Sequence, residues 1–386
     1  MNLAKLSFIT QNFIFNSEVL NINTINSGLI NETYIVEYLY DGKKSQFILQ
    51  SLSNIFDSHE IVNSNHKLIT EHMNKKLNEG FWSFDLNRWE VPNLIKCQSN
   101  NRFFFPYDSN NWRAMIYIDR TFSQDYIEDE SMAYQTGIGL AKFHLTCSDF
   151  DYSKLKNSIN NFHNTKYYMD QYISSIKDSN FSKSDNNNIR VQYLVDSLYK
   201  HIGFVDNLLK DLGKKSIHHN VIHGDPKLNN FLFDVQGKYV VSLIDLDTVS
   251  SGYLLTDIAD CIRSISNLAG EDPIHKENVY FDINSCKYFL KGYFSIIDVQ
   301  MDDNFKLLPE FIYLIIFELT IRFLTDFLKS NTYFKIKYET HNLFKAEIQY
   351  RLLSSFLMQL SNFSKDLKEM GISSDSPFVS DVQKFV

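Results

Sequence analysis

The stretch VIHGDPKLNNFLFDVQGKYVVSLIDLD, residues 221–247, limits what this chain can fold into more than any other segment. Its HGD tripeptide is followed by a proline, which ends regular structure, and then by the short apolar run FLF at 231–233. A Gln-Gly pair predicts a turn before the run YVVSLI at 239–244, which has the composition of a buried strand. Pairing of the two runs as a hairpin would bring the loop before the first run beside the acidic end of the second.

This hairpin would place Asp225, Asn230 and Asp245 at one mouth. Phosphoryl transfer needs such a set, because one carboxylate deprotonates a hydroxyl while an amide oxygen and a second carboxylate hold magnesium against a nucleoside triphosphate. We therefore predict Asp225 as the catalytic base and Asn230 and Asp245 as Mg²⁺ ligands. Asp247 is adjacent, either as an alternative ligand or as a residue that supports the ligands, and His223 orients the loop. Asp, Asn, Gly and Pro also populate ordinary turns. The spacing HGDxxxxN, with a carboxylate fifteen residues after Asn230, favours catalysis over that alternative.

The composition is typical of a globular protein without a strongly basic surface. The formal net charge of −8 argues against binding to nucleic acid or to an anionic membrane, but not against a nucleotide bound with magnesium. The four cysteines form no C-x-x-C pair, so we expect neither a zinc site nor a redox motif. The first fifteen residues lack the pattern of a signal peptide, and the longest apolar segment, 311–317, is too short to cross a bilayer. We expect a cytoplasmic protein; its oligomeric state does not follow from the sequence.

The N-terminal part alternates in the manner of strands. Residues 20–50 contain two apolar runs around Asp41-Gly42, which predicts a hairpin. The preceding turn at 27–31 contains Gly28 and Asn31, and we interpret it as a segment that covers the phosphates of a nucleotide with backbone N–H groups. The alternative for Gly28 is an ordinary hairpin turn.

Further along, residues 57–77 have the spacing of an amphipathic helix. A second hairpin is expected from strands at 102–105 and 113–118 with its turn at 108–111. Ile118 ends this hairpin and is predicted to lie at a hinge beside the nucleotide. Strands, one helix and more strands predict a small nucleotide-binding lobe over residues 1–120.

Residues 121–386 are mainly helical in pattern and are expected to form a catalytic and substrate-binding lobe. The spacing of Ala133, Gly137, Leu140 and Ala141 predicts a core helix at 129–147 whose small residues permit close packing. The other expected elements are helices at 192–212, 306–329 and 340–362, and an exposed Asn/Ser-rich loop at 177–190. The predicted fold class is α+β, with a sheet-containing N-terminal lobe and a helical C-terminal lobe.

Several of these segments resemble a known family. HGDPKLNNFLFD (223–234) and LIDLDTVSSGYLLTDIADCIRS (243–264) are similar to the aminoglycoside phosphotransferase/choline kinase superfamily, which has a bilobal protein-kinase-like fold. Within it, these segments and FELTIRFLTDFLKSNTYFKI (317–336) are most similar to the N-acetylhexosamine 1-kinases. The resemblance implies an ATP- and Mg²⁺-dependent kinase with Asp225 as base. It also implies that Asp247 contacts the sugar and that Arg322 helps to form the sugar pocket.

The resemblance has one clear departure. Protein kinases carry a lysine on the third strand for the nucleotide phosphates, but this chain has Gln50 there. The helix glutamate that would pair with such a lysine is either Glu60 or Glu71. The nucleotide phosphates are therefore expected to depend more on backbone groups and metal.

Other polar residues fall at helical spacing after the motif. Asp257, Asp260 and Arg263 share one helical face, and we predict an ion pair between Asp260 and Arg263, with the two aspartates as alternative supports for the catalytic loop. Glu318 and Arg322 are spaced to pair in an otherwise apolar helix, where an unpaired charge is costly.

The histidines and late aromatics are less informative. His218 and His219 are interpreted as loop residues and not as metal ligands. For His163 two readings stay open, an exposed loop residue or a residue that borders the substrate. Tyr338, and less so Tyr333, is retained as a candidate for stacking on a sugar face, although packing is the commoner role of such residues.

The sequence thus predicts a kinase that transfers the γ-phosphoryl group of ATP to a hydroxyl of a small polar molecule, with the anomeric 1-hydroxyl of an N-acetylhexosamine as the expected acceptor. One alternative is an acceptor like choline, homoserine or an aminoglycoside. Another is a catalytically silent protein that binds a nucleotide or a sugar. Gln50 favours the silent protein, whereas the complete set of Asp225, Asn230 and Asp245 counts against it.

Overall fold

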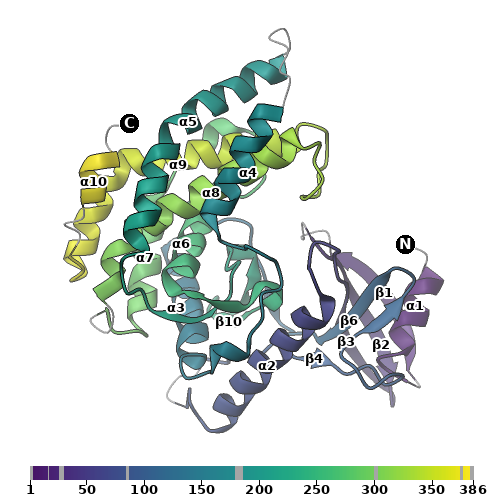
Figure 1. Cartoon of the computed structure of the whole chain (residues 1–386). Coiled ribbons are helices and arrows are strands. Elements are labelled where there is room, and N and C mark those ends of the chain that lie inside the picture. Colours follow the sequence, from purple (N-terminus) through teal and green to yellow (C-terminus); the bar gives the residue numbers. More distant parts are fainter. Residues whose placement is uncertain are drawn as a thin grey trace.

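The structure is a computed structural model that describes residues 3–15, 17–25, 30–83, 87–178, 186–299, 303–373 and 377–382. It has a sheet-containing N-terminal region and a helical C-terminal region, which confirms the predicted fold class. Figure 1 shows the sheet with helix α1 (Leu3–Gln11) at one end of the molecule and most of the helices at the other.

The N-terminal sheet is antiparallel and follows the order β1-β2-β3-β6-β4, with β5 paired to β6. Its strands are β1 (Glu18–Ile25), β2 (Glu32–Tyr40), β3 (Lys43–Ser51), β4 (Leu94–Ile95), β5 (Phe105–Tyr107) and β6 (Asn110–Ile116). The predicted hairpin is confirmed, because Tyr40 pairs with Lys43 around Asp41 and Gly42, both of which have positive φ. Helix α1 packs on this sheet through Leu6 and Ile9, two buried residues of the same apolar cluster as Phe47 and Trp112.

The sheet is accompanied by one long helix and a short second hairpin. Helix α2 (His59–Asn78) matches the predicted helix, and Ser58 caps it by accepting a hydrogen bond from the Ile61 N–H. The second predicted hairpin is formed by β5 and β6, but the position of its first strand, predicted at 102–105, is wrong, because β5 begins only at Phe105. Asn100 accounts for the difference, since its side chain accepts from the Arg102 N–H and donates to the Phe104 carbonyl, which holds the chain in a turn.

The C-terminal region is a helical assembly. Its helices are α3 (Glu130–Thr146), α4 (Thr165–Asp178), α5 (Asn186–Leu212), α6 (Leu254–Ile265), α7 (Ile283–Phe294), α8 (Leu308–Leu328), α9 (His341–Glu369) and α10 (Pro377–Val382). The loop expected at 177–190 is wrong at both ends, because α4 runs to Asp178 and α5 already begins at Asn186. The four cysteines are buried and free of disulfides.

Close packing of α3 confirms the prediction from its small residues. A methyl group built on Gly137 would lie 2.0 Å from the Phe289 carbonyl oxygen of α7, and one built on Gly292 would lie 1.9 Å from the Tyr134 carbonyl oxygen of α3. No side chain fits at either position, so the two backbones touch. This contact fixes α3 against α7 at one end of the core.

The central hairpin is also confirmed. Strand β9 (Phe231–Asp234) pairs with β10 (Val240–Leu243), which is fully buried, and β7 (Thr121–Phe122) adds to β9. A second short pair, β8 (His219–Ile222) with β11 (Ser250–Tyr253), encloses the motif on the other side. The loop at 223–230 therefore leaves β8 and enters β9, beside the residues that follow β10. Within the described part of the chain, no helix has the length and apolarity that a membrane crossing requires.

Candidate active site

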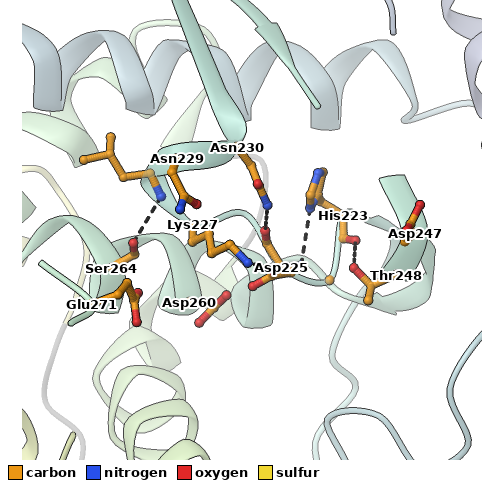
Figure 2. A network of polar contacts seen from close by, with 12 residues as sticks. His223, Asp225, Lys227, Asn229, Asn230, Asp247, Thr248, Asp260, Ser264 and Glu271 are labelled. Atoms are coloured by element: carbon orange, nitrogen blue, oxygen red, sulfur yellow. Dashed lines mark hydrogen bonds and ion pairs between the residues drawn. The ribbon is translucent and has the colours of Figure 1, made fainter. Parts of the chain in front are cut away.

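His223, Asp225 and Asn230 lie together on the loop between β8 and β9 (Figure 2). The Ile244 N–H donates to the Asn230 carbonyl at 2.9 Å, which brings the end of β10 against the loop. The Asn230 side-chain amide donates to the Asp225 carbonyl at 2.7 Å, and a His223 ring nitrogen lies 2.9 Å from the Ile244 carbonyl. Asp225, Asn230 and the residue after Ile244, Asp245, therefore share one end of the hairpin.

Asp257 on α6 anchors this loop from below. Its carboxylate accepts from the His223 N–H at 2.5 Å and from the Gly224 N–H at 2.9 Å, and it lies 3.0 Å from a ring nitrogen of His144. Burial alone would raise the pKa of Asp257, but the hydrogen bond and charge of His144, the charge of His223 and the Gly224 N–H outweigh it and lower the pKa. The loop is thus held by a buried, ionised carboxylate. These contacts agree with the role predicted for Asp257, which is to hold the loop at 223–230 in place.

Gly224 permits this arrangement. Its φ is +88°, a conformation that favours glycine, and a methyl group built there would lie 2.7 Å from the Thr248 carbonyl oxygen. The Thr248 hydroxyl donates to the His223 carbonyl at 2.9 Å. The turn between His223 and Asp225 therefore packs directly on the residues that follow Asp247.

Lys227 is a functional candidate that the sequence analysis missed. Its ammonium group donates to the Asp225 carboxylate at 2.6 Å (Figure 2). Burial alone would lower the pKa of Lys227, but the charges of Asp225 and Asp245 outweigh it and raise the pKa, so the lysine stays charged. The signal was available, because Lys227 lies two residues after Asp225 in the same loop.

The acidic end of β10 has the chemistry of a cation site. Asp245 adopts a left-handed conformation with φ of +66°, and burial together with the neighbouring charge of Asp247 raises its pKa to about 7. A bound cation would relieve this repulsion. The Asn230 nitrogen is used by the Asp225 carbonyl, so its amide oxygen is the atom that can serve a metal.

Among the described residues, no group of three or more His, Cys, Asp or Glu side chains is arranged to hold a metal ion by itself. A site with one carboxylate and one amide fits magnesium, which usually takes its remaining oxygens from water and phosphate. Asn230 and Asp245 therefore fit a metal that arrives with a nucleotide.

Asp247 has partners from the N-terminal region. Its carboxylate accepts from the Asn31 side chain at 2.7 Å and forms a buried ion pair with Arg113 of β6. Arg113 also donates to the Gln50 side-chain oxygen, from Nε at 2.9 Å. Glu60, one of the glutamates considered as a partner at the third strand, is exposed, and so is the other, Glu71.

A second cluster of polar residues lies beside the loop at 223–230. A His163 ring nitrogen lies 2.7 Å from the Gly224 carbonyl, and the other lies 3.6 Å from Glu318 on α8. Burial alone would lower the pKa of His163, but the hydrogen bond and charge of Glu318 outweigh it and raise the pKa. Glu318 in turn lies 3.7 Å from Arg322, which confirms their expected pairing. This chain of contacts connects Arg322 to the catalytic loop.

The Arg322 guanidinium is enclosed by aromatic rings. Their centroids lie 4.6–5.8 Å from its central carbon, and they belong to Phe162, Tyr168, Tyr333 and Phe334. A pocket borders this cluster; Phe162 and His163 line it together with Asn157, Ser158, Thr248 and strand β11.

The remaining candidates lie elsewhere. Gly28 is outside the described residues. Ile118 is 4% exposed, and its carbonyl accepts from the Thr121 hydroxyl at 2.7 Å. Tyr338 is 48% exposed, and its ring lies 4.8 Å from that of His341 in a tilted arrangement. No contact described for Tyr338 reaches the loop at 223–230. The expected ion pair between Asp260 and Arg263 is confirmed at 2.7 Å.

The arrangement of Asp225, Asn230 and Asp245 has the chemistry that phosphoryl transfer to a hydroxyl requires. The sequence model of the phosphotransferase enzyme family, APH, matches residues 128–279. This segment, which contains the β9–β10 hairpin and Asp257, is similar to that family. The match confirms the resemblance to the aminoglycoside phosphotransferase/choline kinase superfamily. It does not test the finer resemblance to the N-acetylhexosamine 1-kinases.

Solved structures agree with this fold over most of the chain. An aminoglycoside phosphotransferase from Alicyclobacillus acidocaldarius aligns with a TM-score of 0.60 at 11% identity, covering 94% of this chain and 96% of the other. A microcompartment-associated aminopropanol kinase gives 0.56 at 16% identity over 94% and 98% of the two chains. The amicoumacin kinase hAmiN, solved with AMP-PNP, Ca²⁺ and its ligand Ami, gives 0.55 at 15% identity over 90% and 94%. At these identities the likeness defines the fold alone.

Proposed function

We propose that this protein transfers the γ-phosphoryl group of ATP to a hydroxyl of a small polar acceptor. One observation carries the proposal: Asp257 holds the loop that contains Asp225 and Asn230, and Asp245 directly follows Ile244, whose N–H bonds to Asn230. The likeness to the amicoumacin kinase, solved with AMP-PNP and Ca²⁺, supports a nucleotide and a divalent cation as ligands of such a fold.

Each residue of the site then has a chemical task. Asp225 accepts the proton of the acceptor hydroxyl as its oxygen attacks the γ-phosphorus. Lys227, 2.6 Å from that carboxylate, holds positive charge where the transferred group gains negative charge. Asn230 and Asp245 would hold Mg²⁺, which when bound neutralises charge on the triphosphate. His223 orients the loop through the Ile244 carbonyl and is not assigned a proton-transfer step.

For the acceptor we propose an amino sugar, with the anomeric 1-hydroxyl of an N-acetylhexosamine as the phosphorylated group. One observation supports a neutral acceptor over a cationic one. The aromatic rings that could cage an ammonium group already enclose Arg322. Asp247 would contact the sugar only if its bonds to Asn31 and Arg113 rearrange.

An amino alcohol is the second candidate, and the names of the structural neighbours favour it. The fold is shared with an aminopropanol kinase and with a choline kinase from Cryptosporidium parvum. Such an acceptor needs an acidic partner for its amine. Asp260, a buried carboxylate near the loop in Figure 2, is already paired with Arg263.

The two candidates separate in a direct assay. Purified protein is incubated with Mg-ATP and a panel of N-acetylhexosamines, amino alcohols and aminoglycosides, and ADP release is followed. We expect stimulation by N-acetylglucosamine or N-acetylgalactosamine. Stimulation only by amino alcohols would support the second candidate, and retained ATP binding without any stimulation would indicate a silent binding protein.

A further inference from the structure

The third strand of the sheet carries no positive charge at the nucleotide site. Gln50 of β3 stands where kinases have a lysine, and its side-chain nitrogen donates to the Thr33 hydroxyl at 3.0 Å. This bond turns the Gln50 oxygen away from Thr33 and towards Arg113. A neutral amide in this position cannot neutralise a triphosphate by itself.

Arg113 stands directly opposite Gln50 on the neighbouring strand. The two residues are paired in the antiparallel register of β3 and β6, so their side chains leave the same face of the sheet. Arg113 donates to the Gln50 oxygen from Nε at 2.9 Å and from Nη2 at 2.5 Å. The guanidinium group therefore occupies the region that a third-strand lysine would reach.

The guanidinium also reaches the phosphoryl-transfer centre. Nη2 pairs with the carboxylate of Asp247, two residues after the metal-ligand candidate Asp245. Arg113 thus bridges the sheet and the residues that follow β10.

One donor of this arginine remains unused. Arg113 is fully buried, with 0% of its surface exposed, and its Nη1 has no hydrogen-bond partner within the described residues. A buried guanidinium normally satisfies its donors, since an unpaired one forfeits its hydration without compensation. The unused donor is next to the two groups already engaged and is free for an anionic ligand.

We propose that Arg113 binds the phosphates of the nucleotide and replaces the third-strand lysine of other kinases. This inference rests on the proposed function, because it assigns a residue to the same nucleotide site. On nucleotide binding, the residues that cover the guanidinium have to move, because Arg113 is fully buried. Arg113 then keeps its bond to Gln50, and Nη1 donates to a phosphate oxygen. Gln50 acts as the positioning residue, since its oxygen holds the guanidinium over the site.

The test compares nucleotides that differ only in their phosphates. Dissociation constants for Mg-ATP and for adenosine are measured by calorimetry for the wild type, Arg113→Gln and Arg113→Lys. We expect Arg113→Gln to weaken Mg-ATP binding at least about tenfold while adenosine binding changes less than about twofold, because only ATP presents the phosphates. Arg113→Lys retains the charge and should recover part of the loss.

A paired exchange keeps the inference testable if the single variant folds poorly. Gln50→Lys combined with Arg113→Gln returns a lysine to the third strand and should bind Mg-ATP nearly as tightly as the wild type; weak Mg-ATP binding by this variant in its folded form would count against the inference. The matched control is Arg190→Gln, which breaks an ion pair with Glu347 on α9 and should change neither constant.

The possible outcomes distinguish a failure of the role proposed for Arg113 from a failure of the proposed function. Unchanged Mg-ATP binding in folded Arg113→Gln would overturn the role of Arg113, and so would an equal loss for ATP and adenosine, which is the signature of a purely structural ion pair. A wild-type protein that binds no Mg-ATP would instead overturn the proposed function. Loss restricted to ATP, with recovery in the exchange variant, supports the inference.

Discussion

Replacement of Asp257 by asparagine tests whether this carboxylate holds the loop at 223–230 in place. The aspartate carboxylate accepts two backbone N–H bonds, from His223 and Gly224, and lies 3.0 Å from His144. Asparagine has nearly the same shape but only one acceptor oxygen. Its side-chain NH₂ group would therefore face at least one of the buried N–H groups, and two donors cannot form a hydrogen bond with each other. Hydrogen bonds to a charged group contribute about 1.5–3 kcal/mol each, so we expect a loss of about 2–4 kcal/mol in the free energy of unfolding.

The same change should reduce turnover. Displacement of a catalytic group by about 1 Å can cost about a hundredfold in rate, so kcat should fall at least tenfold while adenosine binding is kept. Urea unfolding and ADP release are the two measurements. The matched control is Glu347→Gln, which breaks buried contacts to Arg190 and Lys276 away from the loop, and should cost stability without reducing kcat. Asp257→Asn protein with wild-type stability and wild-type kcat would refute the reasoning.

The pH dependence supplies a further check on Asp257. Its pKa is lowered in the folded state, so its contribution to stability is present above the ordinary pKa of a carboxyl group and is lost as the pH falls through the folded value. The Asp257→Asn variant lacks this titration. We therefore expect the stability difference between wild type and variant to shrink in acid; a constant difference would contradict an ionised carboxylate under the loop.

Three other predictions follow from single contacts. Asp225→Ala should abolish transfer and leave Mg-ATP binding measurable, whereas near-normal ADP release would remove Asp225 as the base. Lys227→Met should lower kcat about a hundredfold with little change in the unfolding midpoint, and Lys227→Arg should restore part of it; an unchanged kcat would rule out an electrostatic role. His201 is kept neutral because burial lowers its pKa to about 4, so wild-type stability should fall by up to about 3 kcal/mol as the pH drops from 6.5 to 4. His201→Gln should reduce that slope in urea titrations at several pH values, and an equal slope would show that other groups cause it.

The catalytic hairpin could be predicted because its information is local. The turn residues, the two apolar runs and the acidic end lie within 27 consecutive residues, so register alone brings Asp225 and Asn230 to Asp245. The fold class followed from the same kind of pattern, with alternation in the first part and helical spacing in the second. Lys227 also lay in this local window, and its charge next to the base was the overlooked signal.

The contacts of Arg113 could not be predicted in this way. Its pairing with Gln50 depends on which strands are neighbours, and its ion pair with Asp247 joins residues 134 positions apart. Asp257 was correctly placed on one helical face, but its bonds to the loop depend on how α6 packs under β8. The start of α5 at Asn186 was missed because a run of Asn and Ser has weak helix propensity, which gives no local sign of a helix.

The burial of all four thiols gives this protein a built-in reporter of unfolding. Burial raises the pKa of Cys147, Cys261 and Cys286, so in the folded chain these groups are inaccessible and protonated and should react slowly with alkylating reagents. Cys261 lies on α6, four residues after Asp257, whereas Cys97 lies in the N-terminal cluster. Alkylation followed by mass spectrometry would therefore time the opening of the helical region and of the sheet separately, without any introduced label.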